Sequence, residues 1–344
     1  SGPQFYGSHF YGRPAHRAGS HVIPPDVAPT GAIPAGLHEF MTLDLMPMVA
    51  VNASAATLAL LGSFLVLRRQ AMLGDAMAHS VLPGLVVAFL LTGSRAAGPM
   101  FLGAAAAAAL SGAAIGAIIR YGRVERSAAI GLVYTTMFAL GVLLLELNGG
   151  ANVDLDVDCV LSGQLELMFW NAPTTWAEVL EGPSLAGLPP QPLRLVGLLA
   201  ASCTAVVAGW PLLRAVAFDA PFARSRGLHP SAASAGLMTL TILAIVLSFD
   251  AVGSILAIAL LTCPPATARL LTDRMGPYVL LSVGLGAAAG LLGYLLATRA
   301  APLLLGGSVD ASGTVAALSG LGLLAAAACT ARARRLPESQ GADL

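Results

Sequence analysis

The sequence predicts an all-α integral membrane protein, a polytopic bundle of about nine (eight to nine) transmembrane helices. Only 10% of the 344 residues are charged and 56% are hydrophobic, whereas soluble domains carry about 25% charged residues. Small residues are abundant, with 38 glycines and an alanine run within 103–110. Because small residues let transmembrane helices approach closely, a tightly packed helical bundle is favoured over a barrel.

Nine apolar stretches are long enough to be spans, since a helix needs about 20 apolar residues to cross about 30 Å of hydrocarbon. They cover residues 43–67, 71–92, 97–120, 127–147, 195–216, 231–249, 251–270, 277–298 and 312–331. The number falls to eight if one piece is re-entrant, or if 231–270, which only Asp250 interrupts, does not form two full crossings.

The basic residues predict the orientation of the bundle. All 18 of them are arginines, and 13 fall on one side of the predicted membrane. By the positive-inside rule the arginine-rich side is cytoplasmic. We therefore expect a multi-pass protein with its amino terminus outside and its carboxyl terminus inside.

Three parts are expected along the chain. Residues 1–42 read as an extracytoplasmic disordered arm, because they are polar and broken by glycine and proline. Residues 43–331 form the transmembrane domain, with an outside loop at 148–194. Residues 332–344 form a cytoplasmic tail.

Two outside segments carry residues that could attract metal. The arm holds four of the six histidines, a composition compatible with metal binding or with an inert remnant. In the outside loop, alternating acids predict a substrate-entry surface for cations, with a solvated turn as the alternative. These acids are Asp154, Asp156 and Asp158.

Composition also excludes some functions. The chain has no lysine, and a nucleotide-binding loop of the GxxxxGK[ST] type needs one on the phosphates, so this chain is not itself a P-loop ATPase. Its net charge is zero, and nothing favours nucleic acid as a partner. The four cysteines stand far apart and read as packing residues.

A polar pair interrupts the second span, in the stretch GDAMAHSVLPG at 74–84. Asp75 and His79 stand four residues apart, which places them on one face of a helix. A carboxylate and an imidazole are ligands for Zn, Mn and Fe(II), and charge inside a membrane is costly enough to indicate function. The alternative is that Asp75 caps the helix and His79 bonds a backbone carbonyl.

Two ligands are too few for a tight metal site. If two copies pack about a two-fold axis, two aspartates and two histidines converge on one ion. Such a shared site suits passage rather than storage, because a small movement of the halves opens it. Asp250 is a further candidate for the cation path, with an interfacial residue that reaches the headgroups as the alternative.

Several stretches together resemble a known family. Residues 67–91, LRRQAMLGDAMAHSVLPGLVVAFLL, are similar to the signature of the zinc/manganese/iron permeases, the membrane subunits of binding-protein-dependent ABC importers. The stretches 157–167, 218–230 and 252–275 agree with that family in order and spacing. The resemblance covers roughly residues 43–331.

The resemblance implies a transport subunit rather than an enzyme. It implies uptake of divalent Mn, Zn or Fe across the bacterial cytoplasmic (inner) membrane, with no permanently bound cofactor. The implied partners are a cytoplasmic ABC ATPase that holds the ATP, an extracytoplasmic metal-binding protein, and a second permease protomer in a homodimer or heterodimer. The family places metal passage at the Asp and His of a GDAxxH motif, which here are Asp75 and His79.

The same resemblance identifies a coupling segment at 217–230. In the family this is a short cytoplasmic helix that docks on the ATPase, and the matching positions are Ala223, Arg224 and Gly227. The segment falls on the arginine-rich side between two spans, where a docking element must lie. An ordinary connecting loop is the alternative.

Two other functions fit the sequence less well. A proton- or sodium-coupled secondary transporter working through Asp75 and Asp250 is favoured by inverted repeats, and no convincing repeat is present. An intramembrane metalloprotease requires HExxH or an equivalent third ligand, and no such motif occurs.

Overall fold

The helical fold class is confirmed by the computed structural model, which describes residues 33–93, 97–148, 163, 165–171, 173–176, 187–218, 220–227, 229–307 and 309–335. Within these ranges, eight helices are long and apolar enough to cross a membrane. This number lies within the predicted range of eight to nine, and it counts the 42-residue helix Pro230–Leu271, which is broken at Gly253, once.

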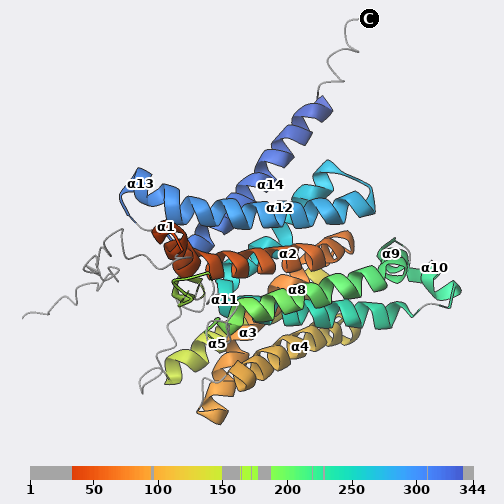
Figure 1. Ribbon diagram of the computed structural model, residues 1–344. Helices are drawn as coiled ribbons and strands as arrows, with labels where there is room; N and C mark the ends of the chain where they lie inside the picture. Colours follow the sequence, from red (N-terminus) through yellow and green to blue (C-terminus); the bar gives the residue numbers. More distant parts are fainter. Residues whose placement is uncertain are drawn as a thin grey trace, which may run out of the picture.

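The helices form an all-α bundle (Figure 1). Their bounds are α1 Ala35–Glu39, α2 Leu45–Leu67, α3 Ala71–Thr92, α4 Ala97–Gly122, α5 Arg126–Asn148, α8 Pro190–Ala208, α9 Trp210–Phe218, α10 Ala220–Ser225, α11 Pro230–Leu271, α12 Met275–Leu295, α13 Ala301–Leu305 and α14 Ala311–Arg335. Two π-helical turns, Phe40–Asp44 and Leu296–Ala300, join α1 to α2 and α12 to α13.

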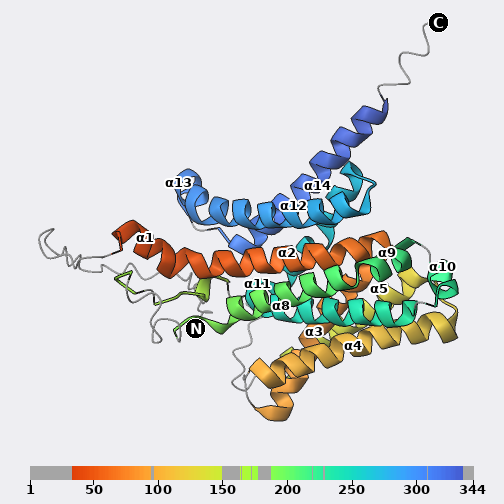
Figure 2. The same cartoon turned by 45° about the vertical axis from the view of Figure 1, so that its right-hand side comes forward.

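Helix α2 lies in the middle of the bundle. Figures 1 and 2 show α12 on one side of it and α8, α11, α3 and α4 on the other. Its span is the most buried of the eight, with 83% of its apolar window inside the protein. A Cβ added to Gly62 would lie 2.0 Å from the carbonyl oxygen of Leu261 in α11, so the α2 and α11 backbones touch.

Helix α3 packs against α4 and α5 through small residues. A Cβ added to Gly84 would lie 2.4 Å from the carbonyl oxygen of Gly103 in α4. One added to Gly141 in α5 would lie 2.9 Å from Pro83 in α3. Because two neighbours hold α3 this closely, its rotation about its own axis, and hence the direction of its polar residues, is fixed.

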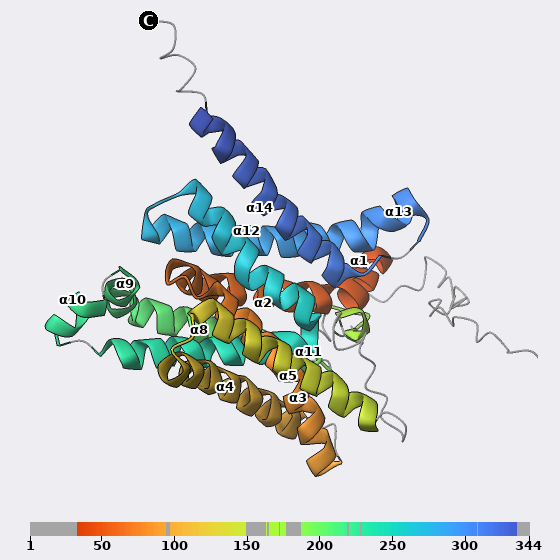
Figure 3. The same cartoon turned by 180° about the vertical axis from the view of Figure 1, so that it is seen from behind.

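Helix α11 doubles back on itself at Gly253, whose φ of 78° and ψ of 172° are not helical. As one straight helix its 42 residues would extend about 63 Å, twice the thickness of the hydrocarbon core. Figure 3 shows instead that both ends of α11 lie toward the same end of the bundle as α10. The predicted stretches 231–249 and 251–270 therefore correspond to two helices that meet at Gly253 within the segment labelled α11.

Hydrogen bonds agree with this reversal. Near the start of α11, Ser234 accepts a hydrogen bond from Arg68 at the end of α2. Shortly after the end of α11, the hydroxyl of Tyr278 donates to the carbonyl of Ser63, also near the end of α2. Both ends of α11 thus lie beside the same end of the central helix.

The helix ends next to the predicted arginine clusters gather at one end of the molecule. These are the end of α2, the α4–α5 and α11–α12 connections, and the α9–α10 segment (Figure 1). At the opposite end, Arg299 pairs with Asp44, which joins the end of α12 to the start of α2. This arrangement agrees with the prediction from arginine placement that successive spans cross the membrane in opposite directions.

The first helix starts earlier than predicted. It begins at Ala35, inside the predicted 1–42 arm, and runs without a break to Leu67. The reason is a small apolar cluster that Met41 and Met46 form with Trp170 from the segment between α5 and α8. Residues 1–32 of the arm lie outside the described residues.

The fifth predicted span, 195–216, is also different. Its helix α8 begins at Pro190, because proline fits the first turn of a helix, where its missing N–H costs nothing. It ends at Gly209, and the remaining residues form the separate short helix α9. The span is therefore displaced toward the amino terminus by several residues.

Candidate functional site

The polar pair of the second predicted span lies on α3. This helix begins at Ala71, just after the chain reverses at Arg69, whose φ is 55°. Asp75 and His79 then occupy positions one helical turn apart. The backbone of Asp75 is helical, and its side chain lies outside the part of the chain that the structure describes.

The imidazole of His79 packs against two aromatic rings of α5. Its centroid lies 4.6 Å from that of Tyr134 and 5.5 Å from that of Phe138, with interplanar angles of 70° and 88°. Both contacts are edge to face, the geometry that aromatic pairs prefer. Two rings therefore fix the plane in which the His79 nitrogens lie.

Among residues 76–80 of α3, whose side chains the structure describes, His79 is the accessible one. Ala76, Met77 and Ala78 are at most 1% exposed, and Ser80 is fully buried, while His79 is half-buried. The hydroxyl of Ser80 bonds that of Ser111 in α4. An ion or a second protein surface can thus reach His79, whereas the neighbouring residues 76–78 and 80 of α3 are buried.

The bundle contains no complete metal site within the part that the structure describes. No three His, Cys, Asp or Glu side chains gather closely enough there to hold an ion. The acids of the predicted substrate-entry surface, Asp154, Asp156 and Asp158, lie outside the described residues.

Asp250, the further candidate, is not brought to His79. It is exposed on α11, three residues before the reversal at Gly253. Ser234 lies at the arginine-rich end, where it accepts a hydrogen bond from Arg68. Asp250 is about 24 Å farther along α11 than Ser234. His79 lies only about 12 Å along α3 from Ala71, at the same arginine-rich end.

The predicted coupling segment 217–230 contains a short helix of its own, α10. Ala223 on this helix is fully buried, whereas Arg224 is exposed. Gly227 follows with a φ of 75°, a conformation that favours glycine. Figure 1 shows α9 and α10 at the arginine-rich end of the bundle.

Sequence reasoning missed Tyr134 and Phe138 as partners of His79. A signal was present, because the two aromatics stand four residues apart in the stretch 127–147 and so share one face of α5. What the spacing could not supply is the register between α3 and α5, which the contact of Gly141 with Pro83 sets.

Comparison with known proteins relates the whole span region to one family. The ABC 3 transport family matches residues 38–168 and 184–321. The chain is 37% identical over 262 residues to the manganese transport system membrane protein MntD of Bacillus subtilis (strain 168), an alignment of 76% of this chain and 83% of that protein. It is 34% identical over 286 residues to the zinc transport system membrane protein TroD of Treponema pallidum (strain Nichols), covering 81% and 73%.

An iron system and a solved structure are similar as well. The chelated iron transport system membrane protein YfeC of Yersinia pestis is 31% identical over 242 residues, 70% of this chain and 73% of that protein. The structure of PsaBC from Streptococcus pneumoniae in complex with Fab matches with a TM-score of 0.64 at 25% identity, over 81% of this chain and 89% of that chain.

Proposed function

The chain belongs to the ABC 3 transport family, and on that premise we propose that it carries Mn, Zn or Fe as divalent ions into the cell. It is the membrane permease subunit of an ABC transporter. Relatives at 31–37% identity are named for manganese, zinc and iron. The observation that carries the proposal is the half-buried His79 one turn from Asp75, in a part of α3 where the neighbouring residues 76–78 and 80 are buried, because carboxylate and imidazole suit all three metals.

Two protomers complete the site. One carboxylate and one imidazole leave much of the coordination of a first-row ion to water. A two-fold axis beside α3 brings a second aspartate and a second histidine to the same ion. The second protomer is either a copy of this chain or a similar permease.

The buried surroundings of His79 bear on how the transported ion loses its water and is later released. The buried Ala76, Met77 and Ala78 offer the ion no polar side chain, so it sheds water only where the carboxylates and imidazoles replace it. It gains the carboxylates and imidazoles in exchange, and it must leave again when the two halves move apart. A site shared between protomers allows this release without unfolding either one.

The energy comes from partner chains. The sequence has no lysine for a P-loop, so a separate cytoplasmic ABC ATPase binds and hydrolyses ATP. Residues 217–230 couple to it, with Ala223 anchoring α10 and Arg224 and Gly227 at the contact. An extracytoplasmic metal-binding protein delivers the ion on the opposite side.

The arginine-rich end supports one orientation by the positive-inside rule. The amino terminus and the loop 148–194 lie outside the bacterial inner membrane, and residues 332–344 lie inside. The exposed Asp250 belongs to the outer half of the bundle in this arrangement, on the side from which the ion arrives.

Proteoliposomes that contain the permease, its ATPase and its metal-binding protein test this function. Uptake of Mn, Zn and Fe(II) is measured separately, with ATP or a non-hydrolysable analogue on the ATPase side. We expect accumulation of at least one metal with ATP only. Uptake that an imposed proton or sodium gradient drives without the ATPase contradicts the proposal and identifies a secondary transporter.

A further inference from the structure

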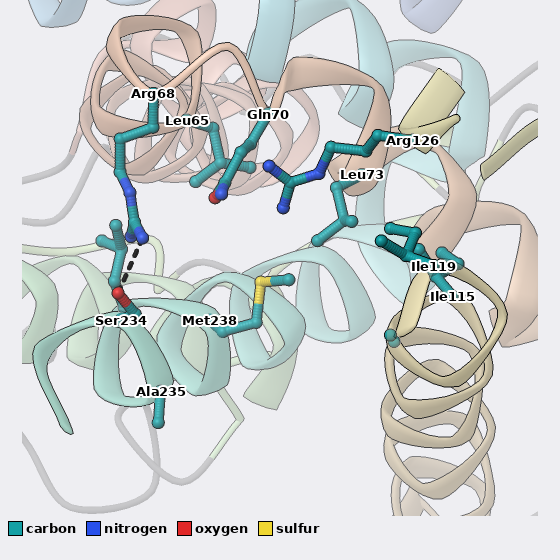
Figure 4. Close-up of a pocket in the computed structure, with 13 residues that line it drawn as sticks. Leu65, Arg68, Gln70, Leu73, Ile115, Ile119, Arg126, Ser234, Ala235 and Met238 are labelled. Carbon is teal, nitrogen blue, oxygen red and sulfur yellow. Dashed lines mark hydrogen bonds between the residues drawn. The ribbon is translucent and has the colours of Figure 1, made fainter. Parts of the chain in front are cut away.

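A pocket of about 360 Å³ lies at the arginine-rich end of the bundle. The ends of α2 and α4 and the starts of α3, α5 and α11 enclose it. In Figure 4, Arg68 and Arg126 reach toward it from opposite sides, with Gln70 between them. His79 is not among the residues that line it.

Two positive charges share this pocket. The guanidinium of Arg68 donates a 2.6 Å hydrogen bond to the hydroxyl of Ser234. Burial lowers the pKa of Arg68, and the like charge of Arg126 lowers it further. The ion pairs among the described residues, Arg269–Asp273 and Arg299–Asp44, involve neither arginine. Because arginine side chains remain charged in proteins, the two guanidiniums give the pocket a positive charge that favours an anionic ligand.

The rest of the lining is apolar. Leu73, Ile119 and Met238 turn toward the space below the arginines (Figure 4). On the α4 wall, Cβ atoms added at Gly112 or Gly116 would meet nothing within 4 Å, so there is open space beside both positions. A ligand that satisfies both halves of the pocket has an anionic head and a hydrocarbon tail.

We propose that this pocket binds the phosphate headgroup of an anionic phospholipid, with an acyl chain along the open α4 wall. The arginines stand at helix ends, the level at which headgroups meet the protein, and basic pockets between transmembrane helices suit such headgroups. Because two arginines repel cations, the pocket is distinct from the path of the proposed metal cargo. Lipid binding can therefore be tested independently of metal transport.

Native mass spectrometry of the full chain in detergent tests the proposal. Three probes are titrated: phosphatidylglycerol, phosphatidylcholine with the same acyl chains, and inorganic phosphate. We expect tight binding of phosphatidylglycerol only. Arg126→Gln weakens it about fivefold, and Arg68→Gln with Arg126→Gln about 25-fold, since an arginine in contact with the anionic headgroup adds about this factor.

Arg120→Gln is the matched control. Arg120 is exposed at the same end, does not line the pocket, and its loss changes the net charge equally, so phosphatidylglycerol binding stays within about twofold. Arg126 is itself exposed, so Arg126→Gln keeps the test valid if the double variant does not fold.

Four results overturn the proposal. Phosphatidylcholine binding as tightly as phosphatidylglycerol removes the role of charge. Equal binding by wild type and Arg126→Gln removes the role of the pocket. Inorganic phosphate competing at the lipid's own concentration makes this a free-anion site. Complete displacement of the lipid by the partner ATPase assigns the pocket to an acidic protein segment.

Discussion

At the scale of single residues, His79 is distinguished by its surroundings. It is the half-buried residue between fully buried neighbours on α3, and two aromatic rings of α5 pack against it in T-shaped geometry. Each edge-to-face contact contributes about 0.5–1.5 kcal/mol beyond burial. That is enough to hold one ring orientation against thermal motion.

The position of the polar pair could be predicted from spacing alone, because residues four apart share a helix face whatever packs against it. The aromatic partners could not. They depend on which turn of α5 lies beside His79, and that register follows from close backbone approaches at Gly84 and Gly141, which a single sequence does not encode locally.

Tyr134 is a positioning residue for the His79 imidazole. Tyr134→Leu keeps an apolar side chain but removes the aromatic ring, a loss of about 1 kcal/mol. We therefore expect the KM for metal uptake to rise about fivefold, with kcat within about twofold. Thr135→Ala is the control, because Thr135 is exposed and bonds only carbonyls of its own helix, at Gly131 and Leu132. A fall in kcat at unchanged KM contradicts the assignment.

At the scale of elements, the break in α11 decides the topology of the second half of the chain. The sequence suggested an interruption at Asp250, where a charge breaks the apolar run. A charged residue does not end a helix by itself, however, and the reversal occurs at Gly253, where φ is positive and ψ is extended. Only glycine adopts that conformation without strain.

Replacing this glycine tests its role. Gly253→Ala places a side chain at a φ of 78°, and we expect the free energy of unfolding to fall by about 1–3 kcal/mol. Gly236→Ala lies in the same helix, where an added Cβ meets nothing within 4 Å, and we expect it to stabilise by up to about 1 kcal/mol. Circular dichroism during denaturation in detergent measures both. Equal stability of Gly253→Ala and wild type refutes the strain argument.

Helix α10 is the element through which we expect the ATPase to act. Arg224→Glu reverses an exposed charge without touching the buried Ala223, so we expect co-purification of the ATPase to drop at least about fivefold. Arg332→Glu, exposed near the end of α14, leaves co-purification unchanged. Equal losses in the two variants point to net charge rather than to α10.

At the scale of the whole molecule, most of the bundle could be predicted from hydropathy and arginine placement. The span 71–92 coincides with α3, and the predicted arginine-rich ends gather in the structure (Figure 1). The early start at Ala35 could not be predicted, because it depends on contact with Trp170, far away in the sequence. Local composition does not report such long-range packing.

We propose that the second protomer docks on the face formed by α4 and α5. In α4 and α5, only 22% of each apolar span window is buried inside the protein. Helix α5 carries the rings on which His79 packs, so the broad exposed surface lies beside the proposed metal site. A partner permease docked there completes the ligand set and covers apolar surface in one step.

Metal uptake by ligand variants in reconstituted proteoliposomes tests the central claim most directly. We predict that Asp75→Asn and His79→Ala permeases still assemble with the ATPase but take up no more metal than wild type without ATP. Ser80→Ala, which removes a buried hydroxyl one residue from His79, costs about 1 kcal/mol of stability and keeps uptake. Full uptake by either ligand variant would contradict the account.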